Sequence, residues 1–140
     1  MEIGRALKRI EMAFRKDGDR MLEKYGLTTS QMSLMMFLFR AADAGRRVIQ
    51  RDIEEALRLK TSTVSGTLDR LEKNGFICRV PDPESRRVNR IELTEKAEAM
   101  KNEGERDMRA FERRVLSPLN EEEQKKLEEM LARILENLPQ

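Results

Sequence analysis

Residues 48–94 constrain the fold of this chain more than any other part of the sequence. Apolar residues recur at helical spacing over about 50–57 and again over 61–73, and only residues 58–60 separate the two patterns. Asn74 and Gly75 are typical of a helix C-cap, and two extended segments, 76–80 and 88–93, follow them. The sequence therefore predicts a short helix, a tight turn, a second helix and a hairpin. This order suits duplex DNA, whose major groove admits a helix.

The second of these helices has an apolar face and a face of small polar residues. Val64, Leu68 and Leu71 recur at i, i+4 and i+7 and predict the core face, with Thr61 or Ser62 as the N-cap. Small residues let a helix approach base edges, and hydroxyls bond to bases or phosphates. The alternative is an ordinary amphipathic surface helix. The outward face comprises Ser62, Gly66, Asp69 and Lys73, flanked by Thr63, Ser65 and Arg70.

The hairpin carries a cluster of arginines with few acids beside them. Arg86 and Arg87 follow Ser85 at its tip, and Arg79 and Arg90 lie on its two strands. Long cations at a hairpin tip can enter a minor groove and neutralise phosphates. The alternative is a solvated loop whose arginines serve solubility.

The charge of the chain is unevenly distributed. The whole sequence has a net charge of +2, but residues 46–90 hold 11 Lys+Arg against 7 Asp+Glu, whereas residues 91–140 hold 9 against 13. The positive segment coincides with the two short helices and the hairpin, where a polyanion would bind. An ordinary solvated surface is again the alternative.

Four more helices are predicted around this segment, so the chain should be mainly α with about six helices. The first runs over residues 3–25 and ends at Gly26, and a second follows a capping box formed by Thr28 and Gln31. The apolar body of the second helix, 32–39, is predicted to be buried. Thr94 caps a long helix that ends near residue 117, and Asn120 begins the last one. In the helix over 50–57, the predicted inward residues are Ile53, Ala56 and Leu57.

The first and last helices each carry an apolar stripe that predicts a dimer interface. Stripes of this length expose much apolar surface unless they meet a partner, and a two-fold homodimer would cover them. The alternative is that both stripes close the core of the monomer. The predicted interface comprises Ile3, Leu7, Ile10, Phe14, Leu127, Met130, Leu131, Ile134, Leu135 and Leu138.

The composition argues against an enzyme and against a metal site. The chain has no histidine, one cysteine and no Gly-rich phosphate loop, so we expect no catalytic residues, no metal and no cofactor. Cys78 is predicted to fill space, and a redox role for it stays open. No apolar run approaches the ~20 residues that span a bilayer. We therefore expect a soluble cytoplasmic protein with no membrane partner.

The sequence resembles the MarR family of bacterial winged helix-turn-helix regulators along nearly its whole length. In that family an aspartate and an arginine precede the Leu-Thr pair that closes the wing; Arg87 takes the arginine position here and Ser85 the aspartate position. The resemblance is carried by Thr63, Val64 and Ser65, by Leu68 and the sequence that follows it to Ile77, by Arg79, by Arg86 and Arg87, and by Leu93, Thr94, Glu95, Lys96 and Ala97.

The resemblance implies one MarR-like domain over 1–140, with a DNA-binding lobe at 28–94 and dimerisation helices at 1–27 and 95–140. Gly66 stands where relatives often carry arginine. Because Ser85 replaces the aspartate that would brace a wing arginine, either Asp82 or Glu84 braces it or the wing is looser. The expected contacts with double-stranded DNA are Lys60, Thr61, Ser62, Thr63, Ser65, Gly66 and Arg70 on the helix, and Arg86, Arg87, Asn89 and Arg90 on the wing.

By the same resemblance, the protein is expected to be a homodimeric repressor that a small effector releases from a pseudo-palindromic operator. The methionines are predicted to pack in the core, and the alternative is that several line a pocket for an apolar effector. The competing function is a winged-helix module that binds proteins without sequence-specific DNA binding. An arginine-rich wing argues against that function, because a protein-docking wing needs no positive tip. The methionines concerned are Met32, Met35, Met36, Met100 and Met108.

Overall fold

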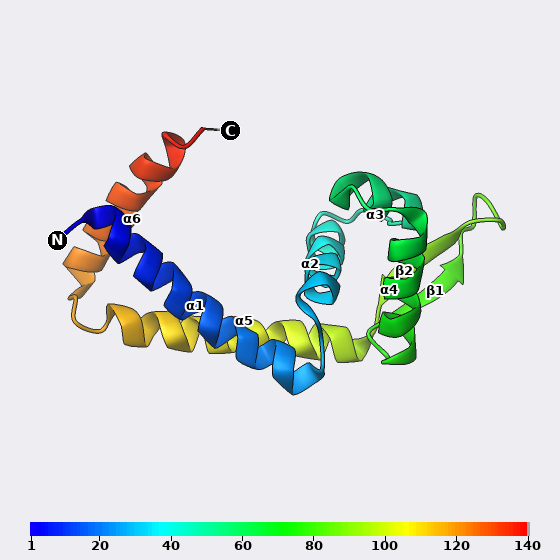
Figure 1. Ribbon diagram of the computed structural model, residues 1–140, viewed down its shortest axis with the longest axis horizontal. Helices are drawn as coiled ribbons and strands as arrows, with labels where there is room; N and C mark the ends of the chain where they lie inside the picture. The colour runs from blue at the N-terminus through cyan, green and yellow to red at the C-terminus, as the bar shows by residue number, and fades with distance from the viewer. Residues whose placement is uncertain (140) are drawn as a thin grey trace. The chain divides into compact units, whose positions relative to one another are not determined.

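The computed structural model describes residues 1–139 and confirms a mainly helical fold with one antiparallel hairpin (Figure 1). The chain divides into two compact units, Met1–Gly104 and Glu105–Gln140. In order, its elements are α1 (Ile3–Tyr25), α2 (Thr29–Asp43), α3 (Gln50–Leu57), α4 (Thr61–Lys73), β1 (Ile77–Pro81), β2 (Asn89–Leu93), α5 (Glu95–Leu116) and α6 (Glu121–Glu136).

Local capping chemistry sets several helix ends where the sequence predicts them. Gly26 ends α1 with φ of 66°, a left-handed conformation that glycine adopts without strain. Thr28 and Gln31 form the predicted capping box: the Gln31 amide donates to Thr28 Oγ1 at 3.1 Å, and the Thr28 amide donates to Gln31 Oε1 at 2.9 Å. Gly75 follows α4 with φ of 81°. These ends depend on residues close in sequence, which is why they were predictable.

The predicted N-cap of α4 was wrong. Lys60 is the N-cap residue, with an extended backbone and no side-chain hydrogen bond to the helix, and Thr61 is already helical. The hydroxyls of Thr61 and Ser62 therefore lie within the first turn, where they do not cap it.

The hydrophobic core of the first unit lies among α2, α3, α4, the hairpin and the start of α5. Its fully buried side chains include Leu34, Met35, Ile53, Phe76 and Met100. Burying a side chain of this size stabilises the fold by about 1.5–3 kcal/mol. The expectation that α2 is buried on nearly every side was too strong, because Met36 is exposed. Ala56 of α3 was also assigned inward wrongly and lies on the exposed side of that short helix.

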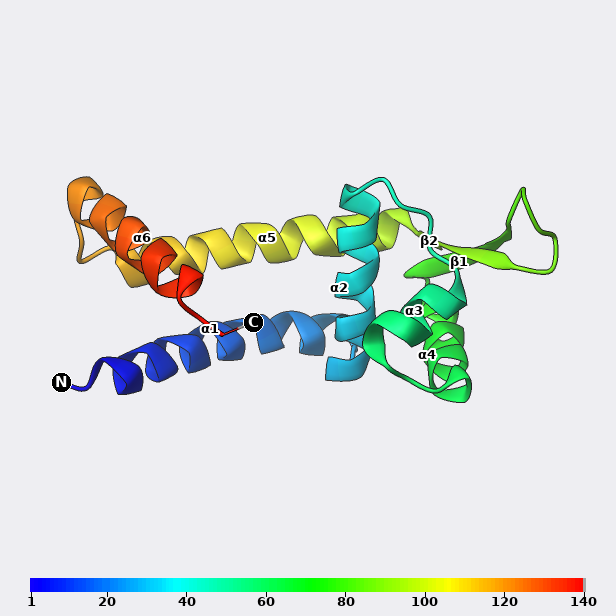
Figure 2. The same cartoon turned by 90° about the horizontal axis from the view of Figure 1, so that it is seen from above.

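The hairpin packs beside α4, and its tip extends away from the helices of this unit in both views (Figures 1 and 2). Its register pairs Ile77 with Leu93 and Pro81 with Asn89. A bridge between Ile49 and Arg90, together with a 2.8 Å hydrogen bond from the Ile91 amide to the Val48 carbonyl, attaches the segment after α2 to β2. The segment between α2 and α3 therefore borders the hairpin.

Thr94 fixes the junction between the hairpin and α5. Its hydroxyl donates to the Gly75 carbonyl at 2.6 Å and accepts from the Ala97 amide at 3.3 Å. Below it, Phe76 is fully buried, with the Tyr25 ring edge-on at 6.3 Å and Lys96 Nζ 4.4 Å from the ring centroid. This cluster joins the end of α1, the residue before β1 and the start of α5 within the first unit.

In the second unit, α6 begins after Asn120, as predicted, and the structure adds a capping box at this start. The Glu123 amide donates to Asn120 Oδ1 and the Asn120 amide donates to Glu123 Oε2, both at 2.9 Å. Gln124 closes the preceding turn by donating to the carbonyls of Leu116 and Leu119. The turn after α5 is thus held by side chains of α6 itself.

The apolar stripes of α1 and α6 do not close the core of the monomer. Neither helix contributes a buried residue, and Ile3 and Leu135 are 71% and 64% exposed. Phe14, Leu127 and Leu131 are partly buried. The other members of the predicted interface, all exposed, are Leu7, Ile10, Met130, Ile134 and Leu138.

Candidate nucleic-acid interface

The outward face of α4 has the small-residue surface that the sequence predicts. Val64, Leu68 and Leu71 are fully buried, so the opposite side of the helix faces outward. On that side, a Cβ added at Gly66 would meet no atom within 4 Å. The protein's own packing therefore does not require a glycine at this position. Of the predicted contacts, Lys60, Thr61, Ser62, Thr63 and Arg70 are exposed, and Ser65 and Gly66 are partly buried.

Arg86 and Arg87 are exposed at the hairpin tip, and the structure gives neither an ion pair with any residue of 1–139. The loop that carries them, residues 82–88, is called the wing loop here. Its backbone is closed by three hydrogen bonds: the Asp82 amide donates to Val88 O at 2.8 Å, Val88 to Ser85 O at 3.1 Å, and Ser85 to Asp82 O at 3.2 Å. The two guanidinium groups are thus available to an external anion on a loop with defined backbone geometry.

The other two hairpin arginines are paired within the protein, so the expectation of few acids beside them was wrong. Arg90 Nη2 lies 3.1 Å from Glu92 Oε1, and Arg90 Nε is buried with no hydrogen-bond partner among the described residues. Asn89, the remaining predicted wing contact, is exposed. Arg90 therefore differs from the free arginines at the tip.

Arg79 links β1 to α4. Its Nη1 lies 2.8 Å from Asp69 Oδ1 and 3.9 Å from Glu72 Oε1, and its Nη2 donates to the Ser65 carbonyl at 3.4 Å. The Arg79 amide also donates to Glu72 Oε2 at 2.9 Å. Arg79 therefore holds the hairpin against the helix whose outward face carries the predicted base contacts.

Sequence reasoning missed Arg47, which braces the wing loop from outside the hairpin. Its Nη2 lies 3.0 Å from Glu84 Oε1 and its Nη1 3.4 Å from Asp82 Oδ1. The hydrogen bond to Glu84 and the negative charges of both acids raise the pKa of Arg47. The expectation that Asp82 or Glu84 braces a wing arginine was wrong, because both acids pair with Arg47 from the segment after α2. The partners are 35 and 37 residues apart, so no local pattern identifies them.

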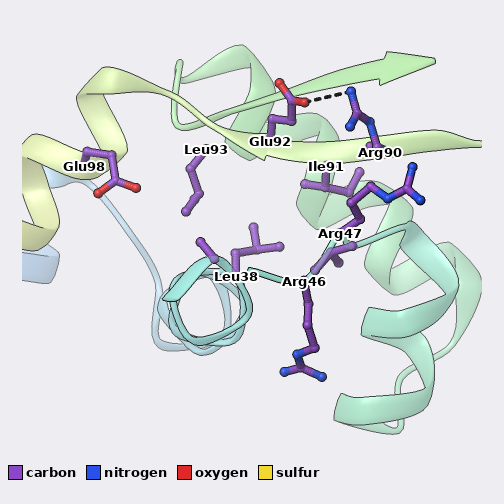
Figure 3. Close-up of a pocket in the computed structure, with 10 residues that line it drawn as sticks. Leu38, Arg46, Arg47, Arg90, Ile91, Glu92, Leu93 and Glu98 are labelled. Atoms are coloured by element: carbon purple, nitrogen blue, oxygen red, sulfur yellow. Dashed lines mark ion pairs between the residues drawn. The ribbon is translucent and has the colours of Figure 1, made fainter. Parts of the chain in front are cut away.

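A cavity of about 350 Å³ lies at the base of the hairpin (Figure 3). In the close-up, Leu38, Ile91 and Leu93 surround an apolar middle, with Arg47 and Arg90 toward one end and Glu98 at the other. Two of the methionines considered for an effector pocket, Met35 and Met100, belong to the packed core instead. The full lining is Leu38, Ala42, Arg46, Arg47, Val48, Arg90, Ile91, Glu92, Leu93 and Glu98.

The described residues contain no group of three or more His, Cys, Asp or Glu side chains that could hold a metal ion. Cys78 lies partly buried on β1, opposite Glu92. Within residues 1–139, none of the helices combines the length and the apolar character needed to cross a membrane.

Comparison with known proteins identifies the family. The MarR family model matches residues 27–88. The HTH-type transcriptional regulator PecS of Dickeya dadantii (strain 3937) is 31% identical over 132 residues, which are 94% of this chain and 79% of PecS. Among solved structures, Bacillus subtilis YusO has a TM-score of 0.80 at 25% identity and covers 97% of this chain, with 94% of YusO covered. An S. aureus MepR–DNA complex has a TM-score of 0.78 at 26% identity and covers 94% of this chain, with 96% of that chain covered. The chain belongs to the MarR family of winged helix-turn-helix transcriptional regulators.

Proposed function

We propose that this DNA-binding regulator is a repressor that binds a pseudo-palindromic operator as a homodimer and is released by a small effector. The DNA-binding part rests on two features of one compact unit: the small-residue face of α4, and two wing-loop arginines that have no ion pair among residues 1–139. A related chain of the same fold is solved bound to DNA. In this proposal α4 enters the major groove and the wing loop contacts the minor groove and phosphates.

The helix contacts divide by chemistry. The hydroxyls of Ser62, Thr63 and Ser65 can donate to or accept from base edges, whereas Lys60 and Arg70 supply charge for phosphates. Gly66 lets the backbone approach the bases but provides no bidentate contact to guanine. We therefore propose that sequence-dependent DNA shape contributes much of the specificity.

The proposed wing contacts differ in whether each arginine already has an ion-pair partner within the protein. Arg86 and Arg87 carry no internal partner in the described chain and should bind phosphates or the minor groove directly. Arg90 stays a proposed contact, but it must share its guanidinium with Glu92. Asn89, which lies between Arg87 and Arg90 in the sequence, is exposed, and its side-chain amide can donate an uncharged hydrogen bond.

A homodimer is proposed because α1 and α6 each leave an apolar stripe exposed. A two-fold dimer would bury these stripes and present two copies of α4 to successive major grooves, about 34 Å apart. The operator should then be a pseudo-palindrome with half-sites one helical turn apart.

The effector part of the proposal rests on the family alone. A small apolar molecule, of unknown identity, would act by binding one arrangement of the dimer better than the other, which lowers DNA affinity by a population shift. Since the partner is duplex DNA in a bacterial-type regulator, we propose the cytoplasm as its location and no membrane partner.

A salt titration of duplex binding tests the DNA-binding proposal. Operators selected from random duplexes would be titrated by fluorescence anisotropy at several salt concentrations. We expect log Kd to rise steeply with log[salt], and Arg87→Ala to reduce the slope by about one. Arg133→Ala, which removes an exposed arginine of α6, is the matched control and should leave the slope unchanged. Absence of duplex binding at low salt would favour the protein-interaction module instead.

A further inference from the structure

We infer that Arg47 is a wing-positioning residue, which sets the wing loop for DNA through Asp82 and Glu84 without touching the duplex. This inference rests on the proposed function. It concerns a residue outside the helix and wing that carry the proposed contacts.

The backbone near Arg47 is fixed against the hairpin. The Val48 carbonyl accepts from the Ile91 amide at 2.8 Å, and Ile49 bridges to Arg90. Arg47 directly precedes these two anchors, so its guanidinium reaches the wing loop from a backbone that is held to β2. A side chain whose backbone is fixed loses less conformational entropy when it forms an ion pair than a side chain on a mobile loop.

Asp82 and Glu84 form the two ion pairs that connect Arg47 to the wing loop; these pairs are called the Arg47 brace here. The Asp82 side chain is only 16% exposed and also accepts from the Glu84 amide at 3.1 Å, whereas the Glu84 side chain is 77% exposed. Since screening by water weakens an exposed pair, we assign most of the positioning to Asp82. The Asp82 carbonyl accepts from the Ser85 amide, so the brace acts on the turn that carries Arg86 and Arg87.

Charge gives the brace a second effect. The wing loop contains two acids, Asp82 and Glu84, and two arginines, Arg86 and Arg87, so its own net charge is zero. Arg47 offsets the acids and leaves the two tip arginines free for phosphates. Without Arg47, the acids are available to attract the tip arginines and to repel the DNA backbone.

Hydrogen exchange on the free protein tests the positioning. Arg47→Ala should speed exchange of the Ser85 and Val88 amides, whose acceptors are the carbonyls of Asp82 and Ser85. Arg47→Lys keeps a cation and should preserve much of the protection. The matched control is Arg46→Ala, since Arg46 is the adjacent exposed arginine and has no ion pair within residues 1–139. Unchanged exchange in Arg47→Ala would overturn the inference.

A double-mutant cycle on the operator separates positioning from direct contact. Arg47→Ala should weaken binding about three- to tenfold, from the loss of two partly screened pairs and the released acids. Arg87→Ala should then cost less in the Arg47→Ala background than in the parent, because the tip is already mispositioned. Independent, multiplicative effects would mean that Arg47 contacts DNA by itself and would sink this inference alone. If the parent protein did not bind duplex DNA at all, the proposed function itself would be refuted.

Discussion

Replacing Gly66 by alanine should stabilise the protein, because the packing of the fold does not require a glycine at this position. Gly66 lies inside α4, where glycine is about 1 kcal/mol less favourable than alanine. It has no positive φ, and an added Cβ would meet nothing within 4 Å, so no strain opposes the gain. We expect the free energy of unfolding to rise by about 1 kcal/mol and the Tm by roughly 3–5 °C.

Urea and thermal unfolding, followed by circular dichroism, measure this change. Gly75→Ala is the matched control, since Gly75 has φ of 81° and alanine there should lower the free energy of unfolding by about 1 kcal/mol or more. A Gly66→Ala variant no more stable than the parent would refute the reasoning that this face of α4 is unpacked. Reduced operator affinity in the stabilised variant would link the glycine to close approach of DNA.

Three further perturbations test other features. Arg79→Met should lower the free energy of unfolding by about 1–2 kcal/mol by releasing β1 from α4; urea unfolding measures this, and no coupling with Asp69→Asn in a double-mutant cycle would contradict it. Leu135→Glu should convert the dimer to a monomer in light-scattering measurements, whereas Glu129→Gln, an exposed residue on the face of α6 away from the stripe, should leave the dimer intact; an unchanged dimer in Leu135→Glu would remove this stripe from the interface. Phe76→Ala should lower the free energy of unfolding by about 3–5 kcal/mol in denaturant titrations, and a loss under 1 kcal/mol would contradict its place in the core.

Much of the fold was predictable because it depends on contacts between residues close in sequence. The capping boxes at Thr28 and Asn120 each involve residues three positions apart, and the core face of α4 follows from its periodicity. The hairpin followed from two short extended runs and the loop between them. The errors were also local: Thr61 and Ser62 offered hydroxyls for a cap that Lys60 occupies, and a helix as short as α3 gives too little periodicity to orient Ala56.

The electrostatic organisation of the site was much less predictable. The exposure of Arg86 and Arg87 agrees with the sequence interpretation, but their role in DNA binding stays a prediction. Arg79 and Arg90 carry the same side chain on the same hairpin, yet both are paired internally. The partners of Arg47 are set by how the segment after α2 runs beside β2. Such pairings depend on tertiary structure, so composition and spacing cannot distinguish a free arginine from a bracing one.

The brace between Arg47 and the wing loop changes how a salt titration of this protein should be interpreted. Added electrolyte screens the half-exposed contacts of Arg47 as well as the contacts between the protein and phosphates. The slope of log Kd against log[salt] therefore counts ions released from DNA together with a rearrangement inside the regulator. A phosphate count taken from the parent slope alone would be too high. The slope of the Arg47→Ala variant should differ from the parent slope through the lost Arg47 pairs and through any phosphate contacts that the mispositioned tip arginines no longer make.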